Sequence, residues 1–417
     1  MDSASSFLKT INTFRCVGVS FVHVYIILGY NVNVNRISVK CRLYPNRRQQ
    51  RTLNETLAVC RQVYNSMVHE RTVCYETQGK SPSMRDQQKE MTQWKKSHEE
   101  LTTVHSQVLQ NVAVRVELAF QAFFRRVKAG EEPAVGRILK SFPPVRNGYP
   151  RLKGKGQYDS ITYPQEGYKV GQNSVTLSKI GQVKAKIHRV CPGTIKTCTV
   201  RKDGDKWYAC FSCEYEAVLL PPCDESVGID VGLKTFAALS NGEGDNFFIE
   251  NPRFFRKEET ALAKAQRKFD KVKDKHGSQD RRRAKKVVRR VHERIKNRRH
   301  NFVHQQSRKL VNRFGVIVVE KLNVKGMVQN HCLAKSISDA SWTQFRNSLT
   351  MKAESAGRLV IVVNPAYTSQ DCSACGYRAK KKLSERWHHC PMCGLVLDRD
   401  TNAAANINAL GQQCVAN

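Results

Sequence analysis

Residues 227–240 read VGIDVGLKTFAALS, and residues 315–322 read GVIVVEKL. The first stretch surrounds one acid, Asp230, with apolar residues and predicts a pair of buried strands. The second is a continuous apolar run that closes on Glu320, which is typical of a strand covered on both faces of a parallel sheet. A similar run, RLVIVVN, occupies residues 358–364. Because helical patterns lie between and after these runs, the second half of the chain is predicted to be an α/β domain.

The chain carries far more positive than negative charge. Its 417 residues include 70 Lys and Arg against 36 Asp and Glu, a formal net charge of +34. A chain of this length divides into two to four domains at roughly 100–200 residues each. The charge argues against an enzyme for acidic or neutral small substrates and favours a polyanionic partner, because each neutralised phosphate releases counterions. Membrane-surface binding is the competing use of positive charge, and it needs an amphipathic or spanning segment.

Residues 253–300 hold a large part of this charge. They form a basic helical stretch interrupted at Gly277-Ser278, with 20 Lys and Arg against 6 Asp and Glu, a local net charge of +14. Such a stretch could be a solvated helix pair, but it would repel itself without a polyanion. We therefore expect this segment to contact nucleic acid through phosphates, which carry little sequence information.

Residues 1–37 contain one apolar run. Residues 17–29 (VGVSFVHVYIILG) are thirteen residues interrupted by His23, against about 20 for a spanning helix. No small-residue cleavage site follows, so a removed signal peptide is less favoured than a translated upstream extension or a loose strand. The 15 cysteines, an odd number, fit a reducing compartment better than a disulfide framework. We expect a cytoplasmic protein without membrane contact.

The pattern changes twice between residue 38 and the natural boundary at Pro221-Pro222. Residues 38–46 (SVKCRLYPN) alternate polar and apolar, like a strand that ends in a turn. From Gln49 to Ala129 apolar residues recur every three or four positions, which predicts helices. Between Ser160 and Glu216 short strands follow one another about every ten residues, as in a small barrel.

Four cysteines are spaced as a zinc site. They form two C-x-x-C pairs with fourteen residues between the pairs. Each pair can place two thiolates about 2.3 Å from one tetrahedral Zn²⁺, which gives a closed structural site. Gly376 and Gly394 follow the pairs, where a tight knuckle needs backbone freedom. The predicted zinc ligands are Cys372, Cys375, Cys390 and Cys393.

Two nearby patterns favour metal binding less strongly. His388 and His389 could replace a thiolate, but the set of four cysteines is complete without them. Cys210 and Cys213 also form a C-x-x-C pair, yet they lie in a predicted strand, where positions i and i+3 point to opposite faces. Because they have no partner pair, we interpret these two cysteines as structural thiols.

Three acids mark the ends or interiors of buried elements. Asp230 lies between apolar strand residues, Glu320 closes a strand, and Asp400 precedes a helix. Burying a charge is costly unless it is paired or bound to metal. Any one of the three could be an ordinary solvent-exposed strand-end acid. Brought together from separate elements, they can hold two Mg²⁺ about 3.5–4 Å apart for in-line phosphodiester hydrolysis, and we predict that role.

Polar residues on the helix expected at 107–127 suggest a second kind of nucleic-acid contact. Gln107, Gln110 and Asn111 can pair with adenine edges, although amides on helix surfaces are more often ordinary. A basic loop and the stretch 253–300 supply cations for phosphates. The predicted nucleic-acid contacts are Gln110, Lys153, Lys155, Arg267, Arg282 and Arg289.

The order of these motifs resembles that of the TnpB (OrfB) proteins of bacterial insertion sequences. These proteins resemble compact ancestors of the type V CRISPR effector nucleases. The resemblance runs from Ser38 to Leu410, and its most specific part is DRDTNAAANINAL (398–410) together with the two C-x-x-C pairs. The other matching stretches are CRLYPN (41–46), CRQVYNSMVHER (60–71), GYPRLKGKGQYDSITYPQ (148–165), GIDVGLKTFAAL (228–239), VIVVEKLNVKGM (316–327), LAKSISDASWTQF (333–345) and NPAYTSQDCSACG (364–376).

The resemblance implies a multidomain α+β fold. Residues 1–37 have no counterpart in the family pattern, and the link at 133–147 is longer than usual in the family, as in a loop insertion or in the drift of an inactive copy. The implied parts are an N-terminal extension (1–37), an OB-like wedge β-barrel (38–46 and 137–222), an inserted helical recognition domain (47–136), a RuvC-like nuclease domain of the RNase H fold (223–365 and 397–417) and a zinc-ribbon insert that binds target nucleic acid (366–396).

The resemblance also implies an RNA-guided DNA endonuclease encoded by a transposable element. Such proteins bind a guide RNA derived from the transposon end and cut double-stranded DNA next to a short transposon-adjacent motif. Asp230, Glu320 and Asp400 carry over as catalytic acids for two Mg²⁺, with Asp398 an alternative to Asp400, and the four cysteines carry over as ligands of one structural Zn²⁺. One monomer per guide RNA, nucleoid-associated in a prokaryote, is expected.

Two other functions compete with this hypothesis. A guide-RNA-dependent DNA-binding protein without cleavage would be favoured by substitution of a catalytic acid, and all three acids are present. A transposase accessory protein that only binds DNA would not need the acids.

Overall fold

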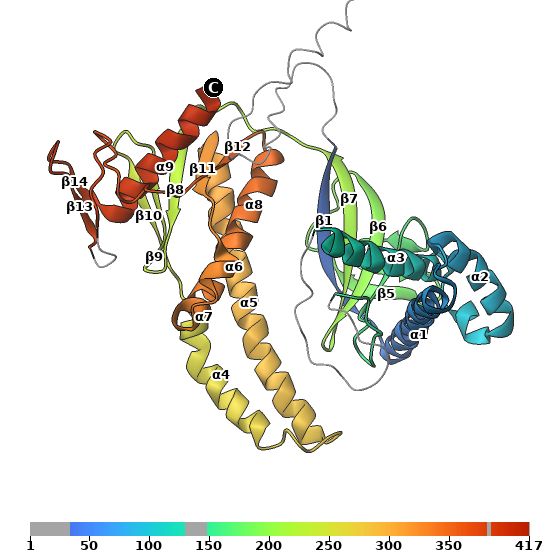
Figure 1. The fold of residues 1–417 in the computed structure, drawn as a ribbon. Helices are drawn as coiled ribbons and strands as arrows, with labels where there is room; N and C mark the ends of the chain where they lie inside the picture. Colours follow the sequence, from blue (N-terminus) through green and yellow to red (C-terminus); the bar gives the residue numbers. More distant parts are fainter. Residues whose placement is uncertain (1–33, 130–147, 382–384, 417) are drawn as a thin grey trace, which may run out of the picture. The chain divides into compact units, whose positions relative to one another are not determined.

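A computed structural model describes residues 34–129, 148–381 and 385–416. The expectations for residues 1–33 and for the link at 133–147 lie outside these described residues. The chain divides into two compact units between Glu216 and Ala217, close to the boundary expected at Pro221-Pro222. Figure 1 shows the elements of both units.

An antiparallel sheet of seven strands forms the frame of the first unit, in the order β2-β6-β7-β1-β5-β4-β3. Its central strand, β1, begins at Val34 rather than Ser38, so residues 34–37 belong to the sheet and not to the expected extension. The short β3 was not expected from the sequence. The strands are β1 (Val34–Tyr44), β2 (Ser160–Tyr163), β3 (Tyr168–Val170), β4 (Ser174–Leu177), β5 (Gly181–Lys186), β6 (Thr194–Asp203) and β7 (Lys206–Glu216).

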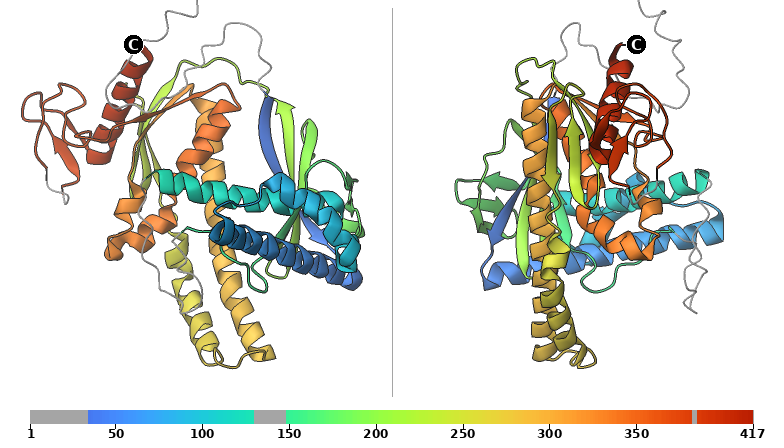
Figure 2. Two further views of the ribbon diagram at one scale, coloured as in Figure 1. Left: turned by 45° about the vertical axis from the view of Figure 1, so that its right-hand side comes forward. Right: turned by 90° about the vertical axis from the view of Figure 1, so that its left-hand side faces the viewer.

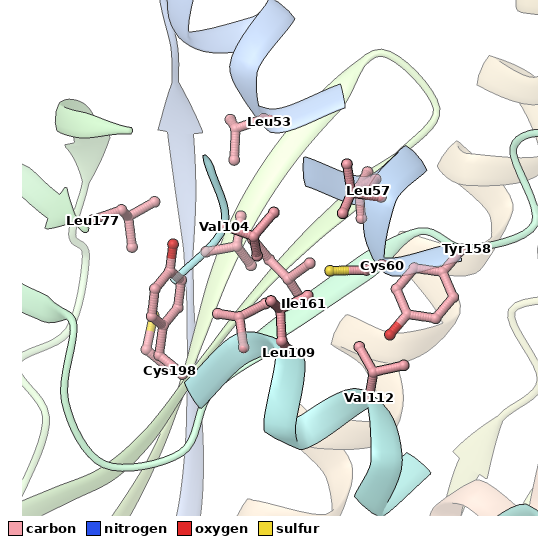
Figure 3. Close-up of a cluster of buried hydrophobic side chains, with 14 of the residues drawn as sticks. Leu53, Leu57, Cys60, Val104, Leu109, Val112, Tyr158, Ile161, Leu177 and Cys198 are labelled. Carbon is pink, nitrogen blue, oxygen red and sulfur yellow. The ribbon is translucent and has the colours of Figure 1, made fainter. Parts of the chain in front are cut away.

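Helices and strands of this unit share one hydrophobic core. In Figure 3, Leu57 of the first helix and Leu109 of the third point toward Ile161 of β2. The first helix begins at a capping box, in which Asn46 and Gln49 exchange side-chain and backbone hydrogen bonds. The helices of the first unit in the described part of the chain are α1 (Arg47–Gln78), α2 (Met84–Ser97), the 3₁₀ helix η2 (Glu99–Thr103) and α3 (Ser106–Lys128).

The second unit is built on a five-stranded sheet in the order β10-β9-β8-β11-β12. Strands β8, β9 and β10 form an antiparallel meander, whereas β8, β11 and β12 run parallel. The three apolar runs of the sequence form four of these strands, which confirms the α/β prediction. The strands are β8 (Ser226–Val231), β9 (Thr235–Ser240), β10 (Asn246–Glu250), β11 (Val316–Glu320) and β12 (Leu359–Val363), with a separate hairpin of β13 (Trp387–His389) and β14 (Val396–Asp398).

Helices cover both faces of the five-stranded sheet (Figure 1). Helices α5 and α8 pack on one face around Ile229 and Ile317, and α9 packs on the other around Val318. The helix expected at 338–356 is interrupted at Ser341, whose φ is 59°. No helix of the described ranges is long and apolar enough to cross a bilayer. The helices are α4 (Phe254–Asp270), α5 (Gln279–Arg313), α6 (Val324–Met327), α7 (His331–Ala340), α8 (Trp342–Glu354) and α9 (Arg399–Ala416).

The basic stretch 253–300 forms a helical hairpin of α4 and α5 (Figure 2). The break at Gly277-Ser278 occurs as expected, but α5 continues beyond residue 300 to Arg313. Buried Glu258 of α4 accepts hydrogen bonds from Arg294 and Arg298 of α5, at 3.0 and 2.8 Å. These two arginines therefore hold the hairpin together.

Gly228 allows α9 to lie directly on β8. A Cβ at this position would overlap the carbonyl oxygen of Ala404 in α9. We expect Gly228→Ala to push α9 off the sheet and to lower the free energy of unfolding by about 1–3 kcal/mol. In thermal unfolding, Tm should fall by roughly 2–4 °C per kcal/mol. Gly154→Ala, where the added Cβ makes only ordinary contacts, should leave Tm unchanged. An unchanged Tm for Gly228→Ala would contradict this packing.

Candidate functional site

Asp230 and Glu320 lie next to each other at the carboxyl ends of two adjacent strands. Strands β8 and β11 are parallel with Ile229 opposite Val319, so the two acids occupy the next position of each strand. Ile229 and Val319 belong to the core that α5 and α8 form. Because successive strand residues alternate between faces, Asp230 and Glu320 lie on the face that α9 covers.

The Asp230 and Glu320 side chains share a hydrogen bond. Burial raises the pKa of Asp230 well above its ordinary value, and the negative charges of Glu320 and Asp400 raise it further. Burial also raises the pKa of Glu320, while the hydrogen bond from Asp230 opposes that rise. Burial and mutual repulsion thus favour the binding of a proton to the pair. A bound cation would stabilise the ionised form of these two acids and so lower their pKa values.

Asp400 lies in the first turn of α9, and Asp398, two residues earlier, is the other candidate for the third acid of the site. Asp398 accepts hydrogen bonds from the backbone N–H groups of Asp400 and Thr401, at 2.9 and 3.2 Å, and so caps the helix. Asp400 is close enough to Asp230 to raise the pKa of that carboxyl. Its own carboxylate lies 3.4 Å from Arg399 and 3.8 Å from Arg386. The capping role of Asp398 favours Asp400 as the third acid of the site.

Separate elements supply the three acids: β8, β11 and α9. They are less tightly gathered than the cysteines, because in the described residues the four cysteines are the one group with three or more ligand atoms all within 4.8 Å of one another. Oxygen ligands of this kind suit Mg²⁺. The mutual repulsion that raises the pKa of Asp230 also favours a divalent cation. The three carboxylates are suitable ligands for such an ion, but they would have to move closer together to bind it.

The raised pKa of Asp230 predicts a pH-dependent stability. Between the ordinary value of 3.8 and the raised folded value, the folded state binds more protons than the unfolded state, so stability falls as pH rises through this window. A difference of one pH unit between the two pKa values corresponds to about 1.4 kcal/mol. Without added Mg²⁺, Asp230→Asn should raise Tm at about pH 8, and this gain should shrink as pH falls.

A matched variant separates this effect from a general change of charge. Asp245→Asn removes an exposed acid from the loop between β9 and β10 and should leave Tm unaltered across the same pH series. Added Mg²⁺ should reverse the order, because it stabilises the wild-type protein through the carboxylate that Asp230→Asn lacks. If Asp230→Asn and Asp245→Asn gave the same pH profile, the buried acid pair would be excluded as the cause.

The four predicted zinc ligands converge on one point. The Sγ atoms of Cys372 and Cys393 are 3.6 Å apart, and those of Cys375 and Cys390 are 3.5 Å apart. Four thiolates at about 2.3 Å from a tetrahedral Zn²⁺ lie roughly 3.8 Å from one another. The cluster therefore fits one zinc ion of the structural, closed type.

Each cysteine pair forms the tight knuckle expected from the sequence. Gly376 and Gly394 have φ values of 74° and 72°. Their N–H groups donate to the carbonyl oxygen of the first cysteine of each pair, at 2.9 and 3.0 Å. His388 is buried and contacts Lys381, and neither it nor His389 belongs to the ligand cluster. The four cysteines complete the set.

Cys210 and Cys213 both lie in β7 of the first unit and do not belong to the cluster of four cysteines. Burial raises the pKa of both thiols, that of Cys213 to about 12. Thiols with such pKa values are poor ligands and poor nucleophiles at neutral pH. The interpretation of this pair as structural agrees with its environment.

Two of the three amides considered for base reading are already hydrogen-bonded within the protein. Gln107 accepts a hydrogen bond from the backbone N–H of Glu166, and Asn111 accepts one from Arg115. These two amides are thus used within the protein, which argues against base reading by them. Gln110 lies exposed on α3 and stays a predicted contact.

The predicted phosphate contacts lie on a loop and on a helical hairpin. Lys153 belongs to a loop fixed to α1, because Asn65 bonds both its N–H and its carbonyl oxygen. Lys155 lies on the same loop, and the three arginines lie on the hairpin of α4 and α5. Lys155, Arg267 and Arg282 are exposed, and Arg289 is half-buried.

Asn402 and Asn406 of α9 belong to the site although the sequence reasoning did not single them out. Their side chains bond to the main chain around the first cysteine pair. Their spacing of four residues places them on one helix face, directly after Asp400. That spacing indicates that they share a helix face, but it does not indicate which residues they contact.

Profiles of known families match successive parts of the chain. OrfB_IS605, described as "Probable transposase", matches residues 211–331, and the profile "Cas12f1-like, TNB domain" matches residues 342–407. A profile described as "Helix-turn-helix domain" matches residues 35–80. In this structure those residues form strand β1 and the single long helix α1.

Relatives cover nearly the full length of the chain. A Streptomyces pristinaespiralis protein, named "Putative RNA-guided DNA endonuclease", is 33% identical over 89% of this chain and 88% of its own length. This chain belongs to the TnpB (OrfB) family. InsQ of Escherichia coli (strain K12), which carries the same description in its name, is 29% identical over 90% of this chain and 92% of its own length. The family assignment from the sequence motifs is thereby confirmed.

A solved structure has a similar fold. The structure named "Cryo-EM structure of the Cas12f1-sgRNA-target DNA complex" gives a TM-score of 0.54 at 14% identity, and the match covers 90% of this chain and 99% of the other. This TnpB-family chain therefore has the fold of a Cas12-type effector.

Proposed function

We propose that this protein is an RNA-guided DNA endonuclease encoded by a transposable element. It binds a guide RNA derived from the transposon end and cuts double-stranded DNA next to a short transposon-adjacent motif. The observation that carries the proposal is the hydrogen-bonded pair of Asp230 and Glu320 on the sheet face covered by α9, the helix that bears Asp400. The names of its relatives and its high net positive charge agree with this function.

The two units divide this function between them. Strand β1 and the strands between Ser160 and Glu216 form an OB-like wedge barrel, which carries the helical recognition domain of α1, α2 and α3. The sheet unit is a RuvC-like nuclease domain of the RNase H fold, and residues 366–396 are its zinc-ribbon insert. Guide pairing reads the target sequence, while the protein reads duplex shape and the short motif. One protein chain acts per guide RNA.

Asp230, Glu320 and Asp400 would hold the metal ions of this reaction. The chemistry that two Mg²⁺ would supply there is activation of a water and stabilisation of the leaving oxygen. A cation bound there would lower the raised pKa of Asp230 and favour its ionised form, which can act as a ligand. The presence of all three acids favours cleavage over a role in DNA binding alone.

The test is to express the gene with its downstream flanking DNA and to sequence the RNA that co-purifies with the protein. The complex is then mixed with a plasmid library that carries a guide-matched target beside randomised motifs. We expect one RNA species from the flanking DNA and Mg²⁺-dependent cutting beside a defined motif. Absence of both the bound RNA and the cutting would overturn the proposal.

A further inference from the structure

The first turns of α9 are attached to both cysteine pairs. The second pair connects to α9 through β14, whose last residue, Asp398, also caps the helix. The backbone N–H of Arg399 donates to the carbonyl oxygen of Arg386 at 2.7 Å, which ties the helix start to the strand before the second pair. The second cysteine pair is therefore joined to α9 by a short stretch of main chain.

The first cysteine pair is attached to α9 by Asn402. Its Nδ2 donates to the carbonyl oxygen of Asp371 at 2.8 Å, and its Oδ1 accepts from the backbone N–H of Ser373 at 3.0 Å. Asp371 and Ser373 flank Cys372, so one amide side chain holds both sides of a zinc ligand. Asn402 is 0% exposed, and these bonds satisfy both ends of its amide.

Asn406 repeats this attachment one helical turn later. Its Nδ2 donates to the carbonyl oxygens of Asp371 and Thr368, at 2.7 and 2.9 Å. The carboxylate of Asp371 is itself held by Arg378 through two bonds of 2.6 and 3.0 Å. The first knuckle is therefore fixed on the helix side by two asparagines and on its other side by an arginine.

We infer that Asn402 and Asn406 are positioning residues for Asp400, which lies between the two attachments. A zinc ion that joins the two cysteine pairs closes a ring of β14, α9, the asparagines and the first knuckle. Helix ends fray unless they are held, so this ring keeps the first turn of α9, and with it Asp400, over the acid pair of the sheet. The inference rests on the proposed function in treating Asp400 as a metal ligand.

The chain supplies a matched control on the same helix. Asn408 is 1% exposed, like Asn402, but its Nδ2 donates to the carbonyl oxygen of Asn241 on the sheet side, at 2.8 Å. Asn402→Leu, Asn406→Leu and Asn408→Leu each replace a buried amide by an uncharged side chain of similar size. Asn402→Asp keeps the acceptor for Ser373, but it loses the donor and buries a carboxylate against the carbonyl oxygen of Asp371.

The first measurement is the rate at which the purified guide-RNA complex releases zinc to a coloured chelator. A typical hydrogen bond contributes about 1 kcal/mol, so we expect release to be about five- to tenfold faster for Asn402→Leu and Asn406→Leu. Asn402→Asp should release zinc at least as fast as Asn402→Leu, and Asn408→Leu should release zinc at the wild-type rate. Equal rates for all three leucine variants would overturn the inference.

The second measurement is Mn²⁺ binding to the same complexes, followed by the loss of the free Mn²⁺ signal in electron paramagnetic resonance. We expect about five- to tenfold weaker Mn²⁺ binding for Asn402→Leu and Asn406→Leu than for Asn408→Leu. Faster zinc release with unchanged Mn²⁺ binding would show that the asparagines serve the zinc site alone and would overturn the positioning role.

Neither measurement requires cleavage. If the complex cut no DNA, the proposed function would fail, but zinc release and Mn²⁺ binding would still compare the two sides of α9. If the complex cut DNA and the Asn402 and Asn406 variants bound Mn²⁺ like Asn408→Leu, the positioning role alone would fail. The retained binding of guide RNA by each variant confirms that it is folded.

Discussion

Asp230→Ala should abolish DNA cleavage and leave the guide RNA bound. Asp230 lies on the central strand of the sheet beside Glu320, so its loss removes one of the three carboxylates proposed to hold the metal ions. Metal-ion stabilisation contributes several kcal/mol to phosphodiester hydrolysis, and each 1.36 kcal/mol is about a factor of ten in rate. We expect single-turnover cleavage of a guide-matched plasmid to slow by about 10³-fold or more.

Guide RNA binding should survive because α5 of the basic hairpin packs on the sheet face opposite α9, away from Asp230. Glu250→Gln is the matched control, since Glu250 is also an acid at the end of a strand of this sheet but is exposed. It should cut at the wild-type rate. Cleavage by Asp230→Ala at the wild-type rate would refute the assignment of the nuclease site.

The acid pair could be predicted from the sequence because its position follows from strand alternation. Apolar runs of five or six residues fix which face each residue takes, and Asp230 and Glu320 each follow a buried residue of such a run. The cysteine knuckles could be predicted for a similar reason, because their geometry depends on local spacing. The pairing of β8 with β11, which brings the two acids side by side, does not follow from local spacing.

Features that depend on distant partners could not be predicted in this way. Asn402 bonds to a carbonyl group 31 positions earlier in the chain, and no local pattern indicates that partner. The first residues of β1 carry no apolar alternation, and they join the sheet by pairing with β7, where Arg36 also contacts Glu214 at 2.7 Å. The helix break at Ser341 has neither Gly nor Pro to mark it.

Cys372→Ser should remove zinc from the protein and release the residues around the knuckles. A serine hydroxyl does not ionise at neutral pH and is a poor zinc ligand, so one ligand of the closed site is lost. Wild-type protein should contain about one zinc ion per chain by elemental analysis, and the variant should contain almost none. Because small zinc modules are unfolded without their metal, limited proteolysis should cut the variant between residues 366 and 396.

The sheet core should persist in Cys372→Ser, because its apolar residues come from β8, β11, α5 and α8 and include none from the knuckles. The variant should therefore keep a cooperative thermal transition while it loses cleavage, since the first turn of α9 is no longer held. Cys332→Ser is the matched control: Cys332 is an exposed thiol of α7 outside the cluster, and its replacement should change neither zinc content nor proteolysis. Full zinc content in Cys372→Ser would show that the four thiolates do not form the site.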